Sequence, residues 1–408
     1  MNVAIMGFGV VGSGVAEVLK NNAAVIEKKC GVSLRLSHIL DIRTFPGSPF
    51  APYMTRDVND ILNDADTDIV VETMGGTEPA FTFVSACLNA GKHVVTSNKE
   101  LVAKKGYQLL ELAKKNGVNF FFEAAVGGGI PIIRPLSRCL AGNNITRVAG
   151  ILNGTTNFIL TKMIVEQMDF AAALRLAQQN GYAEKDPTAD VEGIDACRKI
   201  CILASLAFGS HVYPDGIFTE GISALTLDDV AAAEALGCVI KLIAQTRRLE
   251  NGKISVLVSP ALIKKTHLLS GVSDVFNACL ITGDAVGDVI MVGRGAGKEA
   301  TASAVVGDII DCVDHSSARK TFGWGDAVPG LVEDIDAVPA AFLVRAETSS
   351  KDSDTVALAA ALPGCTMLDS DGSTLLFVTP SLPQGKIKAA LNAAPLRVRS
   401  MLRFFEES

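Results

Sequence analysis

The sequence is poor in aromatic residues, and it lacks paired cysteine motifs and long apolar runs. Aromatic residues make up 6% of the 408 positions, with a single tryptophan, so Val, Ile, Leu and Ala must build most of the core. No stretch approaches the ~18–20 apolar residues of a membrane span, so no membrane association is expected. The nine cysteines are scattered and form no CxxC pair, which suits a reducing cytoplasm. The opening residues lack a basic segment, so no secretory signal is expected.

Basic residues are also too few and too dispersed for a nucleic-acid surface. Lys and Arg number 37 against 44 Asp and Glu, which gives a formal net charge of −7. Nucleic-acid binding requires clustered cations that displace phosphate counterions, so no nucleic-acid partner is expected. Hydrophobic residues make up 49% of the chain and charged residues 20%, a globular composition. At about 150 residues per domain, the length predicts two to three domains.

The first 130 residues alternate between short β-branched runs and helical stretches. Strands are expected at residues 3–6, 34–40, 69–72, 93–96 and 119–122, with helices at 15–20 and 101–116 among the connections. Continuously apolar strands that alternate with helices are typical of a parallel sheet covered on both faces. The sequence therefore predicts an α/β fold with a Rossmann-type, doubly wound domain over 1–130, completed by a helix within 298–315.

The remainder reads as an α+β domain followed by a linker and a small terminal domain. Residues 131–297 carry predicted helices at 158–179 and 193–208 and strands near 254–262 and 278–292, and are expected to hold substrate and dimer contacts. Residues 316–339 lack a periodic pattern and are assigned as a linker. The order of elements in 340–408 is βαββαβ, which is ferredoxin-like.

A glycine-rich turn at the end of the first strand predicts dinucleotide binding. It has the pattern GxGxxG and comprises Gly7, Phe8, Gly9, Val10, Val11 and Gly12. In such turns the glycines permit a tight bend and close approach to a pyrophosphate, which is bound at the helix N-terminus. Asp41 would accept a hydrogen bond from a ribose hydroxyl and favour NAD, whereas Arg43 would meet the 2′-phosphate of NADP. Both cofactors remain open on these residues alone.

Three further groups carry candidate chemistry, each with a structural alternative. Lys99, preceded by Ser97, follows a predicted strand at the edge where ligands bind in α/β folds, but it is also a plausible surface lysine. Asp195 and Lys199 lie four residues apart. This spacing fits an ordinary ion pair on a helix, and it also fits a lysine general acid oriented beside a carboxylate. A turn rich in carboxylates, including Glu184 and Asp190, precedes them.

Glu123 interrupts an apolar stretch and precedes the Gly127–Gly129 loop. An acidic side chain there either caps the following segment or contributes an oxygen ligand to a hard cation, with loop carbonyls completing the shell. A further glycine cluster lies at residues 293–297. We expect the backbone to approach a ligand closely at Gly127–Gly129 and at 293–297.

Taken together in this order and spacing, these segments resemble homoserine dehydrogenases over residues 1 to about 315. The pieces that carry the resemblance are Gly7–Gly12, Asp68–Glu72 with Gly75 and Gly76, Thr96–Lys99, Glu123–Pro131, Gly150–Asn157, Gly181–Asp195, Arg198 with Lys199, and Gly293–Gly297 with Thr301–Ala304. The resemblance implies NAD(P)H-dependent, reversible reduction of L-aspartate 4-semialdehyde to L-homoserine, in threonine, methionine and isoleucine biosynthesis.

The resemblance also implies roles for individual residues. It makes Lys199 the proton donor and Lys99 an assistant in proton transfer, with Glu184, Asp190 and Asp195 binding substrate. Ser97, Gly181 and Gly297 match positions that line the cofactor. A sodium ion, or another monovalent cation, is implied at Glu123 with the backbone carbonyls of Val126, Gly128 and Ile130.

Two other functions compete with this one: a catalytically silent NAD(P)-binding regulator and a dehydrogenase of a related amino-acid aldehyde. The presence of both lysines and the substrate carboxylates favours the active enzyme. Many relatives carry a C-terminal ACT domain, which implies a threonine effector, but residues 347–354 here lack the Pro-Gly turn that commonly binds the amino acid. A homodimer or homotetramer is expected.

Overall fold

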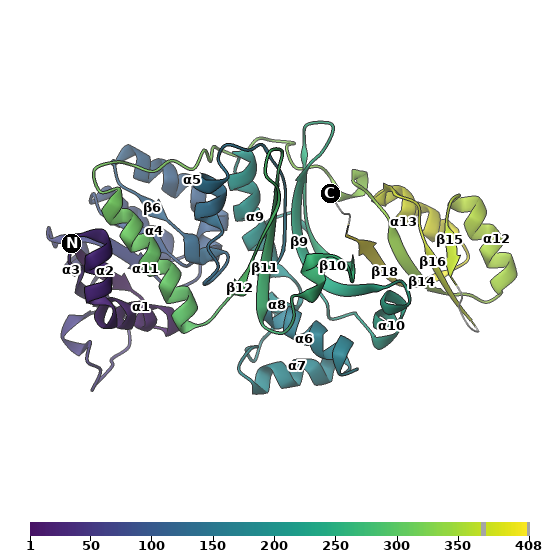
Figure 1. Cartoon of the computed structure of the whole chain (residues 1–408), viewed down its shortest axis with the longest axis horizontal. Helices are drawn as coiled ribbons and strands as arrows, with labels where there is room; N and C mark the ends of the chain where they lie inside the picture. Colours follow the sequence, from purple (N-terminus) through teal and green to yellow (C-terminus); the bar gives the residue numbers. More distant parts are fainter. Residues whose placement is uncertain (369–372, 406–408) are drawn as a thin grey trace. The chain divides into compact units, whose positions relative to one another are not determined.

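The computed structural model of the chain describes residues 1–368 and 373–405 (Figure 1). The predicted terminal domain 340–408 therefore includes two short stretches, 369–372 and 406–408, that lie outside the described residues. The chain forms two compact units. One comprises residues 1–145, 201–215 and 283–328, and the other comprises 146–200, 216–282 and the described part of 329–408. No helix among the described residues is long and apolar enough to cross a membrane.

The first unit contains the predicted parallel sheet, with strands in the order β3-β2-β1-β4-β5-β6. All its strand pairs are parallel. The strands are β1 (Asn2–Met6), β2 (Arg35–Leu40), β3 (Met54–Thr55), β4 (Thr67–Glu72), β5 (His93–Thr96) and β6 (Phe120–Phe121). The connecting helices are α1 (Val10–Asn21), α2 (Ala23–Cys30), α3 (Val58–Leu62), α4 (Ala80–Asn89) and α5 (Lys99–Lys115). The doubly wound fold is confirmed, and β3 is an edge strand that the apolar pattern did not reveal.

Helix α11 (Lys298–Asp314) returns to this sheet as predicted. Ala302, Val305 and Ile309 are buried in one hydrophobic cluster with Val3, Ile5 and other residues of the sheet. Gly14 on α1 permits this packing, because a Cβ there would lie 2.9 Å from the Lys298 side chain and 3.1 Å from Ala302 Cβ. Figure 1 shows α11 running alongside α1. A helix distant in sequence thus completes the nucleotide-binding domain.

The segment after α11 is more ordered than its composition suggested. Trp324 is 6% exposed, and its indole N–H donates to Nδ1 of His211 at 3.1 Å. Its ring packs on Gly106 of α5, where a Cβ would lie only 3.1 Å from the indole. Burial lowers the pKa of His211 to about 4, so this imidazole is neutral at pH 7. The segment is held by isolated side chains such as Trp324, so its order is not visible as a periodic apolar pattern in the sequence.

The second unit is built on a larger mixed sheet with the order β11-β7-β9-β10-β18-β14-β16-β15, and β8 pairs with β10. Its first strands are β7 (Ile145–Ile151), β8 (Phe218–Thr219), β9 (Cys238–Arg248), β10 (Ile254–Lys264) and β11 (Phe276–Gly283); β12 (Gly287–Arg294) follows in the chain. Strand β9 was not predicted, because Lys241 and Gln245 occupy buried positions of this strand and interrupt its apolar pattern.

The helices of this unit flank the sheet and carry the candidate site. They are α6 (Gly154–Val165), α7 (Phe170–Gln179), α8 (Thr188–Val191), α10 (Leu227–Ala235) and the first half of α9 (Ile194–Phe208), up to residue 200. The single helix expected at 158–179 is therefore two helices. Asp169 ends the connection between them by capping α7, accepting a hydrogen bond from the backbone N–H of Ala172 at 2.7 Å.

The described part of the terminal domain has the predicted βαββαβ order. Its elements are β14 (Phe342–Glu347), α12 (Lys351–Ala361), β15 (Thr366–Leu368), β16 (Thr374–Val378), α13 (Gln384–Ala393) and β18 (Arg397–Phe404), with a small ribbon of β13 (Pro339–Ala340) and β17 (Leu382–Pro383). Strands β14, β16 and β15 are antiparallel to their neighbours. Phe342, Val344, Leu358, Phe377 and Ile387 form the centre of its core.

The terminal domain is joined to the rest of its unit by backbone and ionic contacts. Strand β18 pairs in parallel with β10 at Ala261 and Leu262. On the same sheet Arg345 donates to Asp229 at 3.1 Å and to Asp228 at 3.0 Å, both on α10. Asp229 is 1% exposed and also caps α10. One edge of the ferredoxin-like sheet is therefore paired within the chain.

Candidate active site

The glycine-rich turn joins β1 to α1 with the geometry that a pyrophosphate requires. Gly7 has φ +96°, which favours glycine, and a Cβ at Gly12 would lie 1.9 Å from the carbonyl oxygen of Gly7. These two glycines are therefore needed to form the turn itself. A Cβ at Gly9 would meet no protein atom within 4 Å, so packing does not demand glycine there. The open space at Gly9, before the N-terminus of α1, fits a dinucleotide phosphate.

Asp41 and Arg43 form one compact pair beside this turn. The Asp41 carboxylate accepts hydrogen bonds from the backbone N–H of Phe8 at 2.7 Å and of Arg43 at 2.8 Å. The Arg43 guanidinium donates to both carboxylate oxygens, at 3.0 and 2.8 Å. The hydrogen bond from this guanidinium, together with the backbone donors, lowers the pKa of Asp41 to about 2. The carboxylate is buried, whereas the Arg43 side chain is 57% exposed.

Glu72 organises the ends of β4 and β5, a role that its sequence context does not predict. Its carboxylate accepts from the Thr96 hydroxyl at 2.6 Å and from the backbone N–H of Met74 at 2.7 Å. Burial raises the pKa of this carboxyl. Asn98 caps α5 through the N–H of Leu101 at 3.1 Å, and its amide donates to the Gly76 carbonyl at 2.7 Å. Lys99, the first residue of α5, is thereby held at the carboxyl edge of the sheet.

The Glu123 side chain caps the segment that follows it. Oε1 accepts from the backbone N–H of Ile132 at 2.6 Å and of Ile133 at 2.7 Å, and Oε2 accepts from Arg134 N–H at 2.8 Å. Glu123 is 4% exposed. Three backbone donors are thus satisfied by one buried carboxylate, which supports the capping alternative. Any cation at this loop would meet a carboxylate that is already hydrogen-bonded.

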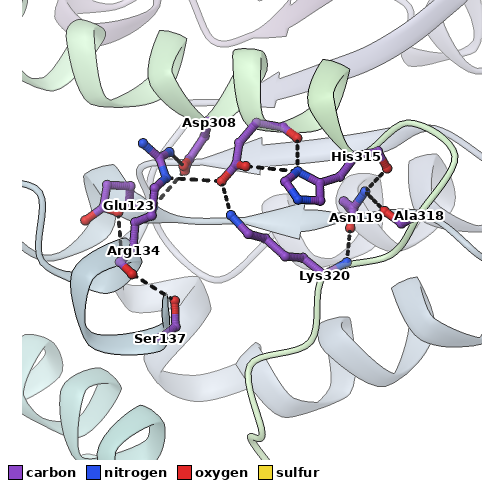
Figure 2. A network of polar contacts seen from close by, with 9 residues as sticks. Asn119, Glu123, Arg134, Ser137, Asp308, His315, Ala318 and Lys320 are labelled. Carbon is purple, nitrogen blue, oxygen red and sulfur yellow. Dashed lines mark hydrogen bonds and ion pairs between the residues drawn. The ribbon is translucent and has the colours of Figure 1, made fainter. Parts of the chain in front are cut away.

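A polar network connects this loop to α11 and the segment beyond it (Figure 2). The Glu123 backbone N–H donates to Asp308 at 2.8 Å, and Arg134 donates to Asp308 at 2.9 Å and to Asp311 at 3.1 Å. Burial, and next the nearby charge of Glu123, raise the pKa of Asp308 to about 8. Lys320 also binds Asp311, at 2.5 Å. The network fixes the 123–134 loop against the helix that completes the domain.

The two later glycine clusters pack against each other. A Cβ at Gly128 would lie 2.3 Å from the carbonyl oxygen of Gly295, and a Cβ at Gly129 would lie 2.9 Å from Ala300 Cβ. The backbone N–H of Gly129 donates to the Arg294 carbonyl at 3.1 Å. The lack of a side chain at Gly128 and Gly129 is therefore explained by the close approach of the other loop. Gly297 differs, since it has φ +120° and a Cβ there would meet open space.

In the second unit, Asp195 and Lys199 form a buried ion pair on α9. Lys199 Nζ lies 2.7 Å from Asp195 Oδ2, and their side chains are 8% and 5% exposed. The same ammonium donates to the backbone carbonyl of Leu152 at 2.7 Å. An exposed pair with this spacing contributes little to stability, but a buried one holds a proton-carrying group in a fixed place.

Asn153 joins this pair to Asp190 and was not singled out from the sequence. Its side-chain amide donates to Asp190 Oδ1 at 2.7 Å and to Asp195 Oδ2 at 3.0 Å. Its side-chain oxygen caps α6 by accepting from the Thr156 N–H at 2.9 Å. The available signal was an asparagine that ends a strand and precedes a helix, the pattern of an N-cap. That pattern predicts the cap but not its two carboxylate partners.

The carboxylate-rich turn lies close to the start of α6. The Thr155 hydroxyl donates to the Tyr182 carbonyl at 2.7 Å, which ties α6 to the turn. Gly181 has φ +73°, and Glu184 is exposed. The structure thus brings Asp190, Asp195 and Lys199 together in the second unit. The glycine turn, the Asp41–Arg43 pair and the residues at the ends of β4 and β5 belong to the first.

A Rossmann sheet with a glycine turn that fits a dinucleotide, together with a buried lysine–carboxylate pair, defines an NAD(P)-dependent dehydrogenase. The family models for the NAD-binding domain of homoserine dehydrogenase and for homoserine dehydrogenase match residues 7–123 and 131–310, respectively. The chain belongs to the homoserine dehydrogenase family. It is 43% identical over 317 residues to a homoserine dehydrogenase of a Synechocystis strain, which covers 77% of this chain and 73% of that protein.

Solved structures agree with this assignment. A homoserine dehydrogenase from Thiobacillus denitrificans superposes with a TM-score of 0.93 at 37% identity, covering 100% of this chain and 98% of the other. A hyperthermophilic archaeal homoserine dehydrogenase in complex with NADPH superposes with a TM-score of 0.65 at 30% identity, covering 76% of this chain and 97% of the other. The protein is therefore an oxidoreductase that interconverts aspartate 4-semialdehyde and homoserine with a nicotinamide dinucleotide.

Proposed function

We propose that Lys199 is the general acid of aldehyde reduction and the general base of homoserine oxidation. Bound NAD(P)H supplies the hydride to the aldehyde carbon, and the carbonyl oxygen must then gain a proton. The observation that carries this role is the buried contact of Lys199 Nζ with Asp195 and with the Leu152 carbonyl, each at 2.7 Å. An ammonium fixed in this way stabilises the developing alkoxide and delivers a proton without reorganisation.

The other residues of the proposed site bind the substrate, assist proton transfer or line the cofactor. We assign the ammonium group of homoserine to the carboxylates of the turn, Glu184 and Asp190, and its hydroxyl end to the neighbourhood of Asp195. Lys99 begins α5 at the carboxyl edge of the sheet and assists proton transfer there. Ser97, Gly181 and Gly297 line the cofactor. Opposite charge between the turn and an amino-acid ammonium supports this orientation.

The Asp41–Arg43 pair supports a preference for NADP(H). Both Asp41 oxygens already accept hydrogen bonds from Phe8 and Arg43, so a ribose hydroxyl would have to displace one of these donors. Arg43 is exposed, and its guanidinium lies 5.1 Å from the centre of the Phe45 ring. A held, exposed guanidinium beside the turn is suited to a 2′-phosphate. Asp41 therefore positions the arginine rather than binding ribose.

Replacing Arg43 with Gln is expected to reverse the cofactor preference. Loss of a charge-assisted phosphate contact of ~1.5–3 kcal/mol raises KM for NADP⁺ by about 10- to 100-fold. KM for NAD⁺ stays the same or falls, because Asp41 becomes available to ribose. Homoserine oxidation with each cofactor, followed at 340 nm, measures both values and tests the reaction itself.

The matched control for this experiment is Arg35→Gln, an exposed arginine at the other end of β2. It should leave both KM values at those of the parent protein. An unchanged ratio of the two KM values in Arg43→Gln would remove Arg43 from cofactor selection.

A monovalent cation such as Na⁺ is proposed at the 123–130 loop, through backbone carbonyls of Val126, Gly128 and Ile130 with Glu123. The tight fold of the loop supports this, since a Cβ at Gly127 would lie 2.5 Å from the Ile130 carbonyl oxygen. Because the Glu123 carboxylate accepts three backbone N–H groups, its contribution is mainly to hold the carbonyls in place.

The terminal domain is proposed to be an ACT-like module whose first loop, residues 347–354, is closed by hydrogen bonds between its own side chains. Thr348 donates its hydroxyl to Asp354, and Ser353 donates to the same carboxylate at 3.2 Å. Asp354 is 4% exposed. These contacts close residues 347–354 on themselves, at the place where an amino-acid effector would require open backbone groups.

Threonine is therefore expected to have little effect on homoserine oxidation by the full chain. Initial rates measured across a threonine titration should remain flat, because the Thr348 and Ser353 hydroxyls and the Asp354 carboxylate are already hydrogen-bonded to one another. Potent, saturable inhibition that disappears when the chain is truncated after Ala337 would establish a threonine effector site instead.

We also propose that the protein forms a homodimer or homotetramer and works in the cytoplasm. Phe276 at the start of β11 is 41% exposed and Val292 on β12 is 56% exposed, which supports association through the 131–297 domain. The scattered cysteines, without a CxxC pair, support a reducing compartment.

A further inference from the structure

We propose that Asn153 is a positioning residue for the proton-transfer lysine: it holds the Asp190 and Asp195 carboxylates in place through its two amide N–H groups. The inference rests on the proposed role of Lys199 and deepens it. Asn153 ends the strand–helix connection between β7 and α6 and is 6% exposed. It acts on Lys199 through Asp195, whose Oδ2 atom contacts both the Asn153 amide and the Lys199 ammonium.

The orientation of the Asn153 amide is fixed by the helix that it caps. Its oxygen accepts from the Thr156 backbone N–H at 2.9 Å and lies 3.0 Å from the Thr156 hydroxyl. Because a backbone N–H can only donate, the oxygen must face α6 and the NH₂ group must face the carboxylates. Both amide protons are then used, one on Asp190 Oδ1 at 2.7 Å and one on Asp195 Oδ2 at 3.0 Å.

Two consecutive residues thereby hold the ion pair from one side. Asp195 Oδ2 is shared between the Asn153 amide at 3.0 Å and the Lys199 ammonium at 2.7 Å. The carbonyl of Leu152, the preceding residue, accepts from Lys199 at 2.7 Å. Three charged groups meet at this point: Asp190 from α8, and Asp195 and Lys199 from α9. A neutral amide suits the position, because it fixes two carboxylates without taking the proton that Lys199 transfers.

Asn153→Asp separates positioning from capping. Aspartate caps a helix as well as asparagine does, so α6 keeps its first hydrogen bonds. The two donors are lost, and a third carboxylate is added beside Asp190 and Asp195. We expect kcat for homoserine oxidation to fall about 10- to 100-fold, less than the ~10²- to 10⁴-fold loss expected when the general acid or base itself is removed. The added negative charge favours the protonated lysine, so the acidic limb of the kcat profile moves to higher pH by about one unit.

Asn157→Asp is the matched control, one turn further along the same helix. The Asn157 amide donates to the backbone carbonyls of Val272 and Phe276, and its oxygen accepts from Lys241 at 3.1 Å. This change introduces the same charge in an equally buried place, but away from Asp195. Its kcat profile should keep the parent's pH limb. NADPH binding, followed by nucleotide fluorescence, verifies that each variant is folded.

The outcomes separate this inference from the role of Lys199. Near-normal turnover of Lys199→Ala overturns the general acid assignment and the inference built on it. An inactive Lys199→Ala with a parent-like rate and pH limb in Asn153→Asp overturns the inference alone. In the double variant, Asn153→Asp should add little to the loss caused by Lys199→Ala, since both act on one group.

If Asn153→Asp fails to bind NADPH, Asn153→Ser decides the question. Serine retains a capping oxygen without added charge and lacks the pair of amide donors. We expect about a tenfold or larger loss of kcat, smaller than the ~10²- to 10⁴-fold loss expected when the general acid or base itself is removed. KM for NADP⁺ should be unchanged. A parent-like kcat in this variant would show that Asn153 serves only as a helix cap.

Discussion

Lys199→Ala is expected to lower kcat for homoserine oxidation by about 10²- to 10⁴-fold, the usual loss when a general acid or base is removed. Alanine cannot carry the proton, and it leaves the Asp195 carboxylate, 5% exposed, without its cationic partner. Affinity for NADPH should be retained, because the glycine turn and the Asp41–Arg43 pair belong to the other compact unit. Steady-state kinetics in both directions, together with NADPH titration, measure these effects.

Lys162→Ala provides the control for the loss of a lysine. Lys162 forms an i,i+4 pair with Glu166 at 2.7 Å on α6, and these side chains are 20% and 43% exposed. The spacing equals that of Asp195 and Lys199, but the pair lies at the surface and its removal should leave kcat near that of the parent. Comparable losses in the two variants would point to general destabilisation rather than to proton transfer by Lys199.

Glu123→Ala is expected to produce the largest loss of stability, about 2–5 kcal/mol in the free energy of unfolding. The substitution leaves three backbone N–H groups, of Ile132, Ile133 and Arg134, without the carboxylate that accepts them. Urea unfolding followed by fluorescence measures the loss, and Trp324, the only tryptophan, lies in the same compact unit. Glu123→Gln keeps one acceptor oxygen and should be intermediate.

The exposed acid Glu111 on α5 is the control, since its contact with Lys114 is 3.4 Å long and its side chain is 45% exposed. Glu111→Ala should change the free energy of unfolding by less than about 0.5 kcal/mol. Equal effects at the two positions would refute the capping role of Glu123. Parent activity measured in sodium, potassium and choline salts tests the cation separately, and indifference to the salt would argue against one at this loop.

The sequence located most of the fold because its signals are local. Apolar β-branched runs and the GxGxxG turn are readable over a few residues, and they placed β1, β2, β4, β5 and the completing helix α11 close to their observed positions. The βαββαβ order of the terminal domain followed for the same reason. Local patterns failed at β9, where Lys241 is buried in a strand, and in the segment after α11, which is held by isolated contacts such as those of Trp324 and Lys320.

The chemistry of the site depended on contacts between segments distant in the chain. Sequence by itself determined which groups were available: the glycine turn, Asp41 with Arg43, Glu123, and the Asp195–Lys199 spacing. Only the tertiary structure decided what they do. It showed that Asp41 holds Arg43, that Glu123 caps the next segment, and that Asn153 spans Asp190 and Asp195. The reason is physical: the function of a carboxylate is set by the donors that surround it, and folding alone brings those donors together.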